Sequence, residues 1–227
     1  MNSEKARYNM VLQQIQTTEV LDEELRTLLF SVKREAFVPE AYRDLAFADV
    51  EIPLMSNSIA STENSATPAM LAPKVEAKII KALKLKASDS VLEVGTGSGY
   101  LTALLAARSD EVYSVEIVPE LAIKARDNLY NQGVSNVEVE TGDAAQGWPS
   151  YAPYDAIVMS GSMPVLPKAL LAQLKVGGRL FAIVGVAPAM EARLITCTAH
   201  GQYRTITLFE TSVAPLVNAQ QPEHFDF

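Results

Sequence analysis

Three glycines at alternate positions, Gly95, Gly97 and Gly99, follow an apolar run at residues 91–94. The run predicts a strand, and the residues after the glycines predict a helix over 101–107. Glycines allow a tight turn and a close approach of ligand to backbone, and the amino end of a helix supplies free N–H groups. A strand, a glycine turn and a helix in this order therefore indicate a site for a nucleotide-type ligand.

The spacing of the glycines separates two kinds of nucleotide site. A dinucleotide-binding fingerprint reads G-x-G-x-x-G, but here the third glycine comes one residue early and Tyr100 stands in its place. With Glu93 two residues before Gly95, the stretch resembles motif I of the S-adenosylmethionine-dependent methyltransferases. A glycine turn of this length is also compatible with a plain structural turn, so the remaining residues have to distinguish the two.

Acidic residues follow the next two expected strands. Glu116 ends the second strand, where a carboxylate reaches the ribose hydroxyls of a nucleotide, and Asp143 follows the third, where it can accept from the adenine amine. The loop 160–164 after the fourth strand would lie beside the sulfonium and methyl group. These features predict S-adenosylmethionine as cofactor. The expected cofactor-binding residues are Glu93, Gly95, Thr96, Gly97, Ser98, Gly99, Glu116, Asp143, Ala144 and Ser160.

Purely structural readings remain open for several of these side chains. Glu116 could be a solvated strand end, and Asp143 an N-cap or turn residue. Glu93 either stabilises the turn or contacts the amino group of the cofactor. The hydroxyls of Thr96 and Ser98 could cap the helix instead of touching a ligand.

Strand and helix patterns alternate from residue 90 onward. The expected strands are 91–94, 111–117, 137–140, 155–160, 179–184, 192–199 and 203–210; the expected helices between them are 101–107, 119–132 and 166–174. This alternation predicts an α/β fold with a doubly wound, Rossmann-like methyltransferase sheet that has helices on both faces. The sheet is expected to be mostly parallel and to end in an antiparallel C-terminal hairpin.

The residues before this core predict N-terminal helices. Apolar spacing indicates helices at 8–15, 21–32 and 73–83 and a short turn or helix at 40–45. Residues 55–69 are rich in Ser, Thr, Asn and Ala without a period, which is typical of a mobile loop or lid. We expect a single methyltransferase domain over 1–227, with 1–83 as helical N-terminal extension and substrate loop and 84–227 as cofactor-binding core.

Composition excludes several classes of protein. A net charge of −8 and a pI of about 4.9 disfavour a nucleic-acid partner, which needs basic surface. No apolar run is long enough to span a membrane, and the amino terminus lacks the apolar core of a signal peptide. With a single cysteine and two histidines, we expect a cytoplasmic protein without an internal disulfide and without a metal site. Nothing in the pattern specifies an oligomeric state.

Longer motifs point to one family. Residues 34–49 (REAFVPEAYRDLAFAD), 112–116, 147–149 with 152–157, and 174–180 resemble the signatures of the protein-L-isoaspartate O-methyltransferases. That family transfers a methyl group from S-adenosylmethionine to the α-carboxylate of an isoaspartyl residue, the first step of protein repair. The resemblance implies a peptide or protein carboxylate as acceptor. It requires no catalytic acid or base, because the carboxylate is already ionised and the cofactor carries its leaving group.

The chain departs from the family in the substrate loop. There the family normally reads G-x-G-Q-T-I-S-x-P, and its Thr and Ser help to hold the substrate. If Pro73 is the proline of that motif, Leu71 stands where the serine is expected, and a longer Ser/Asn/Thr segment precedes it. Ser65 and Thr67 are candidate substitutes for the missing hydroxyl.

Three alternatives to isoaspartyl methylation follow from this departure and from the fold class. The first is a methyltransferase with the same cofactor site and another small-molecule or protein acceptor. The second is a catalytically inactive cofactor-binding protein that acts by interaction. The third is an NAD-dependent oxidoreductase, against which Tyr100 argues because it replaces the third dinucleotide-type glycine.

Overall fold

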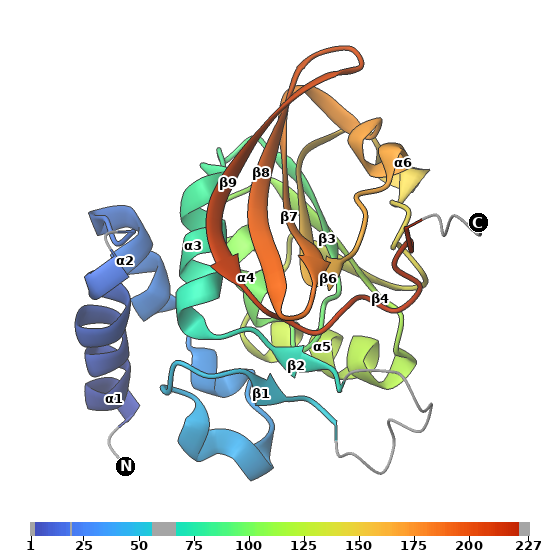
Figure 1. The fold of residues 1–227 in the computed structure, drawn as a ribbon. Helices are drawn as coiled ribbons and strands as arrows, with labels where there is room; N and C mark the ends of the chain where they lie inside the picture. The colour runs from blue at the N-terminus through green and yellow to red at the C-terminus, as the bar shows by residue number, and fades with distance from the viewer. Residues whose placement is uncertain (1–2, 19, 56–66, 223–227) are drawn as a thin grey trace.

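A central seven-stranded sheet organises the chain (Figure 1). The computed structural model describes residues 3–18, 20–55 and 67–222. The strands of the sheet are β3 (Ser90–Val94), β4 (Glu111–Glu116), β5 (Val137–Thr141), β6 (Tyr154–Met163), β7 (Leu174–Val186), β8 (Ala189–Ala199) and β9 (Gln202–Thr211). Their spatial order is β5-β4-β3-β6-β7-β8-β9. Strands β3 to β7 pair in parallel, and β8 and β9 add antiparallel pairs, so the predicted mostly parallel sheet with a C-terminal hairpin is confirmed.

The strand order reverses between β3 and β6. From β3 the chain moves outward through β4 to β5, and it then returns to place β6 on the other side of β3. In a doubly wound sheet, ligands bind beyond the carboxyl ends of the strands at this reversal. The glycine turn follows β3 directly and therefore lies at the expected binding position.

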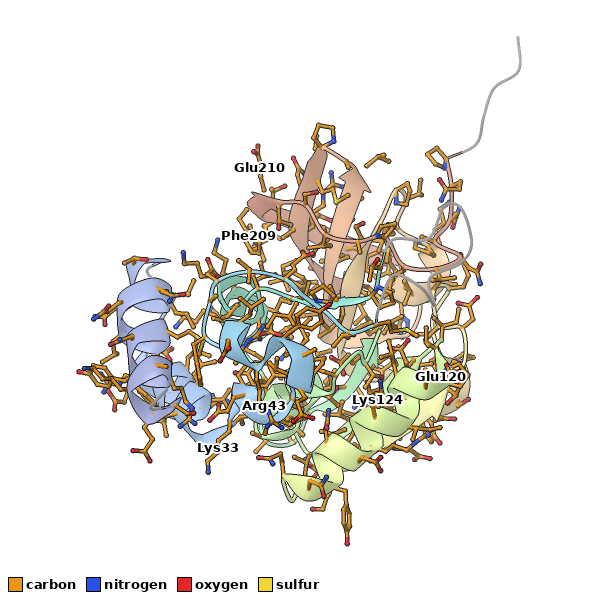
Figure 2. All side chains as sticks on the ribbon, turned by 90° about the horizontal axis from the view of Figure 1, so that it is seen from below. Lys33, Arg43, Glu120, Lys124, Phe209 and Glu210 are labelled. Carbon is orange, nitrogen blue, oxygen red and sulfur yellow. The ribbon has the colours of Figure 1, made fainter. Side chains whose placement is uncertain are left out.

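Three helices cover one face of the sheet. These are α3 (Pro73–Leu83), α4 (Tyr100–Ala106) and α5 (Pro119–Asn131), whereas the short α6 (Lys168–Leu171) and a 3₁₀ turn at Pro149–Tyr151 lie on the opposite side (Figure 1). Helix α5 is amphipathic: Leu121 and Ala125 are buried, while Glu120 and Lys124 lie on its outer surface (Figure 2). The prediction of helices on both faces therefore holds, with very unequal cover.

Alternation along the inner strands builds a core on each face of the sheet. Val91 and Val158 pack in the core beneath α3 to α5, whereas their neighbours Leu92 and Ile157 pack in the second core on the opposite face. Cys197 is buried in the second core, as expected for a small apolar residue.

The N-terminal segment is helical, as predicted, but less regular. It comprises α1 (Ser3–Asn9), a π-helix (Met10–Ile15), 3₁₀ turns at Gln16–Thr18, Arg34–Ala36 and Glu40–Leu45, and α2 (Glu23–Ser31). Tyr8, which the apolar spacing grouped with Val11, Leu12 and Ile15, is 52% exposed; the other three lie in the π-helix, whose wider turn does not keep Tyr8 on their face. No helix within the described ranges is long and apolar enough to cross a membrane.

The predicted loop 55–69 is only partly described. Residues 56–66, with the candidate Ser65, lie outside the described residues. The predicted C-terminal end of the loop was wrong, because Ala69 already belongs to a strand: β2 (Ala69–Met70) pairs antiparallel with β1 (Ile52–Pro53). Strands of two residues carry too little alternation to be recognised in a sequence.

Several boundaries beyond β5 were also wrong: β7, expected at 179–184, begins at Leu174, and β8, expected at 192–199, begins at Ala189. Strand β6 continues through Met163, where a loop 160–164 was expected, because a bulge between Val158 and Ser162 lets the strand resume its pairing with β7. The helix expected at 166–174 is four residues long, since Leu174 already pairs with Tyr154 and begins β7.

Candidate functional site

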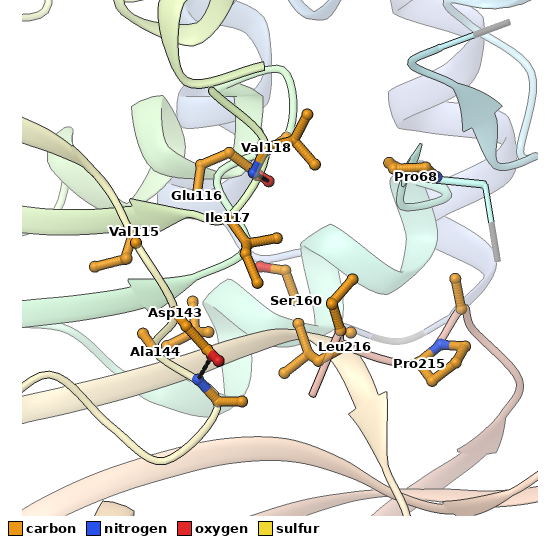
Figure 3. A pocket seen from close by; sticks show the side chains of 18 of the residues that line it. Pro68, Val115, Glu116, Ile117, Val118, Asp143, Ala144, Ser160, Pro215 and Leu216 are labelled. Atoms are coloured by element: carbon orange, nitrogen blue, oxygen red, sulfur yellow. Dashed lines mark hydrogen bonds between the residues drawn. The ribbon is translucent and has the colours of Figure 1, made fainter. Parts of the chain in front are cut away.

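An open cleft lies at the reversal point of the sheet (Figure 3). It has a volume of about 120 Å³ and is partly open to solvent. Six of the expected residues line it: Gly95, Gly97, Glu116, Asp143, Ala144 and Ser160. Its other walls are mainly apolar and come from β3, β4, the N-terminal segment and the C-terminal tail.

The glycine turn brings backbone directly against the cleft. Gly97 has φ +58°, a left-handed conformation that side chains disfavour, and a Cβ there would lie 3.0 Å from Leu54 Cδ1. The N–H of Gly97 donates to Glu116 Oε2 over 2.8 Å. The turn is thus joined to the end of β4 and packed beneath the N-terminal segment.

Glu116 is held by two backbone donors. Its Oε2 accepts from Gly97 N, and its Oε1 accepts from Val118 N over 3.0 Å (Figure 3). The residue is only 5% exposed but lines the cleft. Because a carboxylate oxygen accepts about two hydrogen bonds, each oxygen keeps capacity for one further donor. Glu116 is therefore oriented and can still accept from two ligand hydroxyls.

Glu93 lies deeper, under the turn. Its Oε2 accepts from Thr102 Oγ1 and from Ser114 Oγ, while Oε1 is buried and finds no hydrogen-bond partner within the described part of the chain. A cavity of about 30 Å³, with room for roughly two water-sized groups, is lined by Glu93 and Ser160, whose Oγ is likewise buried and without a partner. Burial raises the pKa of Glu93 from 4.5 to about 8.

This pKa predicts a pH dependence of stability. Between about pH 4.5 and 8 the folded chain keeps a proton on Glu93 that the unfolded chain has released, so stability falls as pH rises through this window and then levels off. Glu93→Gln, which cannot ionise, should lose less stability between pH 5 and pH 8, by on the order of a few kcal/mol. Urea unfolding of both proteins at the two pH values measures this. Equal losses would show that Glu93 is ionised in the folded chain.

Asp143 is at the far end of the cleft and is exposed. Its Oδ1 accepts from Ala145 N over 3.0 Å, which is a turn contact, and its Oδ2 accepts from Asn218 Nδ2 over 2.8 Å. Asp143 thus makes the turn contact that the structural reading proposed, while it also lines the cleft.

The other expected residues have structural partners. Thr96 shares a hydrogen bond with Ser114, and Ser98 Oγ accepts from Tyr100 N at the start of α4; both line only the small cavity. Gly99 lines neither cavity. Its φ is +85°, and a Cβ there would meet Leu129 of α5 at 3.2 Å, so packing of helix on turn explains this glycine.

The N-terminal segment forms a wall of the cleft that the residue pattern did not predict. Leu54, Pro68 and Ala69 line it, and Leu54 N donates to Pro68 O over 2.9 Å. Leu71, at the position of the missing serine, is 7% exposed and lines the small cavity. This side of the site is therefore apolar.

A buried arginine fixes that wall. Arg34 is fully buried; it donates to Glu76, to Leu71 O over 2.8 Å and to Ala46 O over 3.1 Å. Its guanidinium also lies 5.1 Å from the ring centroid of Tyr100. The signature 34–49 is thereby joined to α3, to the start of α4 and to the segment around Leu71.

The C-terminal tail forms the opposite wall. Residues 213–219, the C-terminal strap, run along β6: Ser162 N donates to Ala214 O and Leu216 N donates to Ser162 O, both over 2.9 Å. Leu216 packs so closely on Gly161 that a Cβ there would lie 2.9 Å from it. Leu216 and Val217 are apolar, but their residue types did not indicate a wall of the cleft.

The cleft combines two carboxylates with apolar walls. Its described lining contains no Lys, Arg or His. Hydroxyls, amines and a cationic centre fit such a lining. Within the described ranges, no group of three His, Cys, Asp or Glu side chains could hold a metal ion.

Known proteins provide an independent comparison. The model of the protein-L-isoaspartate(D-aspartate) O-methyltransferase family matches residues 5–221. The chain is 40% identical to protein-L-isoaspartate O-methyltransferase 2 of Pelobacter propionicus, covering 96% of this chain and 93% of that one. It is 38% identical to the Rhodopseudomonas palustris protein of the same family name, covering 94% and 95%.

A solved structure shares the fold. It is a putative protein-L-isoaspartate O-methyltransferase of Plasmodium falciparum in complex with S-adenosyl-L-homocysteine, with a TM-score of 0.74 and 19% identity over 96% of this chain and 99% of that one. The fold, the cleft at the reversal point and the match over nearly the whole sequence agree. The chain belongs to the protein-L-isoaspartate(D-aspartate) O-methyltransferase family.

Proposed function

We propose that this protein transfers the methyl group of S-adenosylmethionine to the α-carboxylate of isoaspartyl residues in damaged proteins. The observation that carries the proposal is the pair of carboxylates, Glu116 and Asp143, at the ends of neighbouring strands in a cleft lined without cations. Family membership supports the reaction class. Repair of protein, rather than another use of the ester, is part of the proposal.

The described residues fit the proposed cofactor. Glu116 would accept from the two ribose hydroxyls with its remaining capacity, and Asp143 from the adenine amine. The unpaired Oε1 of Glu93 is suited to the α-ammonium group, for which the small cavity is large enough. Gly95 and Gly97 leave room for the methionine part beside Ser160.

The proposed methyl transfer needs no acid or base from the protein. S-adenosylmethionine, when bound, supplies an activated methyl group together with its leaving group, and the acceptor carboxylate is ionised at neutral pH. The residues of the cleft therefore have to orient the two partners and exclude water. We therefore assign no general acid or base.

A second candidate function is methylation of a different acceptor. The observation that favours it is Leu71, which is buried, carries no hydroxyl and has its carbonyl occupied by Arg34. An apolar wall here suits an acceptor whose neighbouring groups are apolar.

A labelling experiment tests these functions. The protein is incubated with methyl-labelled S-adenosylmethionine and an isoaspartyl peptide, beside the same peptide with ordinary aspartate. Base-labile label on the isoaspartyl peptide alone is the expected result. Binding of the cofactor without transfer of label to the isoaspartyl peptide would contradict the proposal. In that case, label on other acceptors would support the second function. Label on no acceptor would indicate an inactive cofactor-binding protein.

Glu116→Gln should weaken the binding of S-adenosylhomocysteine by roughly 30- to 100-fold. Hydrogen bonds to a charged acceptor are worth about 1.5–3 kcal/mol, and the NH₂ group of the new amide would face a backbone N–H donor. Titration calorimetry measures the change. Glu111→Gln, at the exposed start of the same strand, is the control and should bind as the wild type does. Unchanged binding by Glu116→Gln would remove Glu116 from the site.

We also keep three wider expectations as proposals. The N-terminal extension 1–83 and the core 84–227 act as one domain, since Leu54 and Ala69 complete the cleft built by the core. The acidic net charge of −8 supports a protein or peptide partner rather than a nucleic acid. The single cysteine supports a cytoplasmic location.

A further inference from the structure

Asn218 contacts a side chain of the proposed cofactor site from outside the cleft. It belongs to the C-terminal strap, and its Nδ2 donates to Asp143 Oδ2 over 2.8 Å. The other oxygen, Oδ1, accepts from Ala145 N over 3.0 Å. Each oxygen of the Asp143 carboxylate therefore has one donor, and the two donors come from segments far apart in the sequence.

The backbone at Asn218 is specialised for this contact. Its φ is +60°, a left-handed conformation that Asn tolerates better than most residues. The strap on its amino side is fixed: Leu216 packs against Gly161, and Ala219 N donates to Leu216 O over 3.2 Å. Asn218 is thus presented to Asp143 by a hydrogen-bonded turn, although its side chain is exposed.

Asp143 needs such a partner more than Glu116 does. Glu116 is 5% exposed and accepts from two backbone N–H groups. Asp143 is exposed and accepts from one backbone N–H group, that of Ala145. A carboxylate on the surface that is held at one oxygen samples other rotamers and is hydrated, and ordering it on ligand binding costs affinity. A second donor removes that freedom before the ligand arrives.

We propose that Asn218 is a positioning residue that holds the Asp143 carboxylate ready for the 6-amino group of adenine, and that it thereby sets the preference for 6-amino over 6-oxo purine nucleosides. The inference rests on the proposed function, in which Asp143 accepts from the adenine amine. Asp143 Oδ2 retains a second acceptor position for that amine. A 6-oxo group at the same place would direct a carbonyl oxygen at the carboxylate, which is unfavourable.

The test compares two ligands, S-adenosylhomocysteine and its 6-oxo analogue S-inosylhomocysteine, on four full-length proteins. These are the wild type, Asn218→Gly, Asn218→Asp and the control Gln221→Ala. Glycine removes the side chain and suits the positive φ, so the strap keeps its backbone. Aspartate keeps the shape but places a carboxylate against Asp143. Gln221 lies in the same tail and donates to Ala219 O without touching Asp143.

For Asn218→Gly we expect the dissociation constant of S-adenosylhomocysteine to rise about fivefold, the size of one exposed charge-assisted hydrogen bond, with that of the 6-oxo analogue unchanged. Asn218→Asp should weaken the amino ligand further, and Gln221→Ala should bind both ligands as the wild type does. The ratio of the two constants is decisive, because a strap that only covers the cleft would alter both equally.

Two outcomes overturn the inference. Equal weakening of both ligands would make Asn218 a part of the strap alone, and unchanged binding by both Asn218 variants would leave it no role. The failure of the proposed function looks different: the wild type itself would bind the two ligands equally, or would bind neither. If Asn218→Gly does not fold, the isosteric Asn218→Asp provides the test instead, with a larger expected change in the ratio of the two constants.

Discussion

Gly97→Arg is expected to abolish measurable binding of S-adenosylhomocysteine, with a loss of about 1,000-fold or more. The residue has φ +58°, and the first carbon of a side chain would already touch Leu54 Cδ1 at 3.0 Å. The rest of the arginine would have to enter the cleft, where it would fill the space proposed for the methionine part of the ligand. Titration calorimetry with S-adenosylhomocysteine measures the loss.

The matched control for this variant is Gly133→Arg. Gly133 also has a positive φ, +71°, but nothing lies within 4 Å of its Cβ position. Both variants place a side chain at a positive φ, and of the two only Gly97→Arg fills the cleft. Binding by Gly97→Arg within about threefold of the control would place the cofactor elsewhere.

Arg34→Ala is expected to destabilise the fold by about 3–5 kcal/mol, the usual cost of leaving one charge of a buried ion pair without its partner. The side chains of Arg34 and Glu76 are 0% and 3% exposed, and the variant also removes the donors of the Ala46 and Leu71 carbonyls. The free energy of urea unfolding measures the change.

Arg26→Ala is the control for the buried pair. Its partner is Glu23, and the two side chains are 41% and 76% exposed, so the free energy of unfolding should stay within experimental error of the wild-type value. A loss of under 1 kcal/mol in Arg34→Ala would mean that Glu76 is neutral or hydrated when Arg34 is absent, and the anchoring of the segment at Leu71 would then need another explanation.

Local patterns predicted the core of this fold well. Helix α3 was predicted over its full range, and β3, β4, β5 and α5 were predicted within one residue at each end, because their apolar periods and turn residues are contained in a single segment. The glycine turn and Glu116 were brought together as expected, since parallel neighbouring strands end at the same edge of a sheet.

Long-range contacts account for what the pattern did not predict. The bulge in β6 depends on its pairing with β7, and the contact between Asn218 and Asp143 joins residues 75 positions apart. Leu216 carries no signal that distinguishes a cleft wall from an ordinary core residue. For Gly99, the residue type and spacing predicted a contact with the ligand, whereas close packing against Leu129 explains why a glycine is needed there.

The central claim is that the cleft at the strand reversal holds the cofactor with Glu116 at the ribose and Asp143 at the adenine. A crystal structure of the wild-type protein with S-adenosylhomocysteine tests it most directly. The account predicts both ribose hydroxyls within hydrogen-bond distance of Glu116, the 6-amino group on Asp143, and the ammonium group beside Glu93 Oε1. A ligand bound elsewhere, or bound in this cleft with its ribose turned away from Glu116, would contradict it.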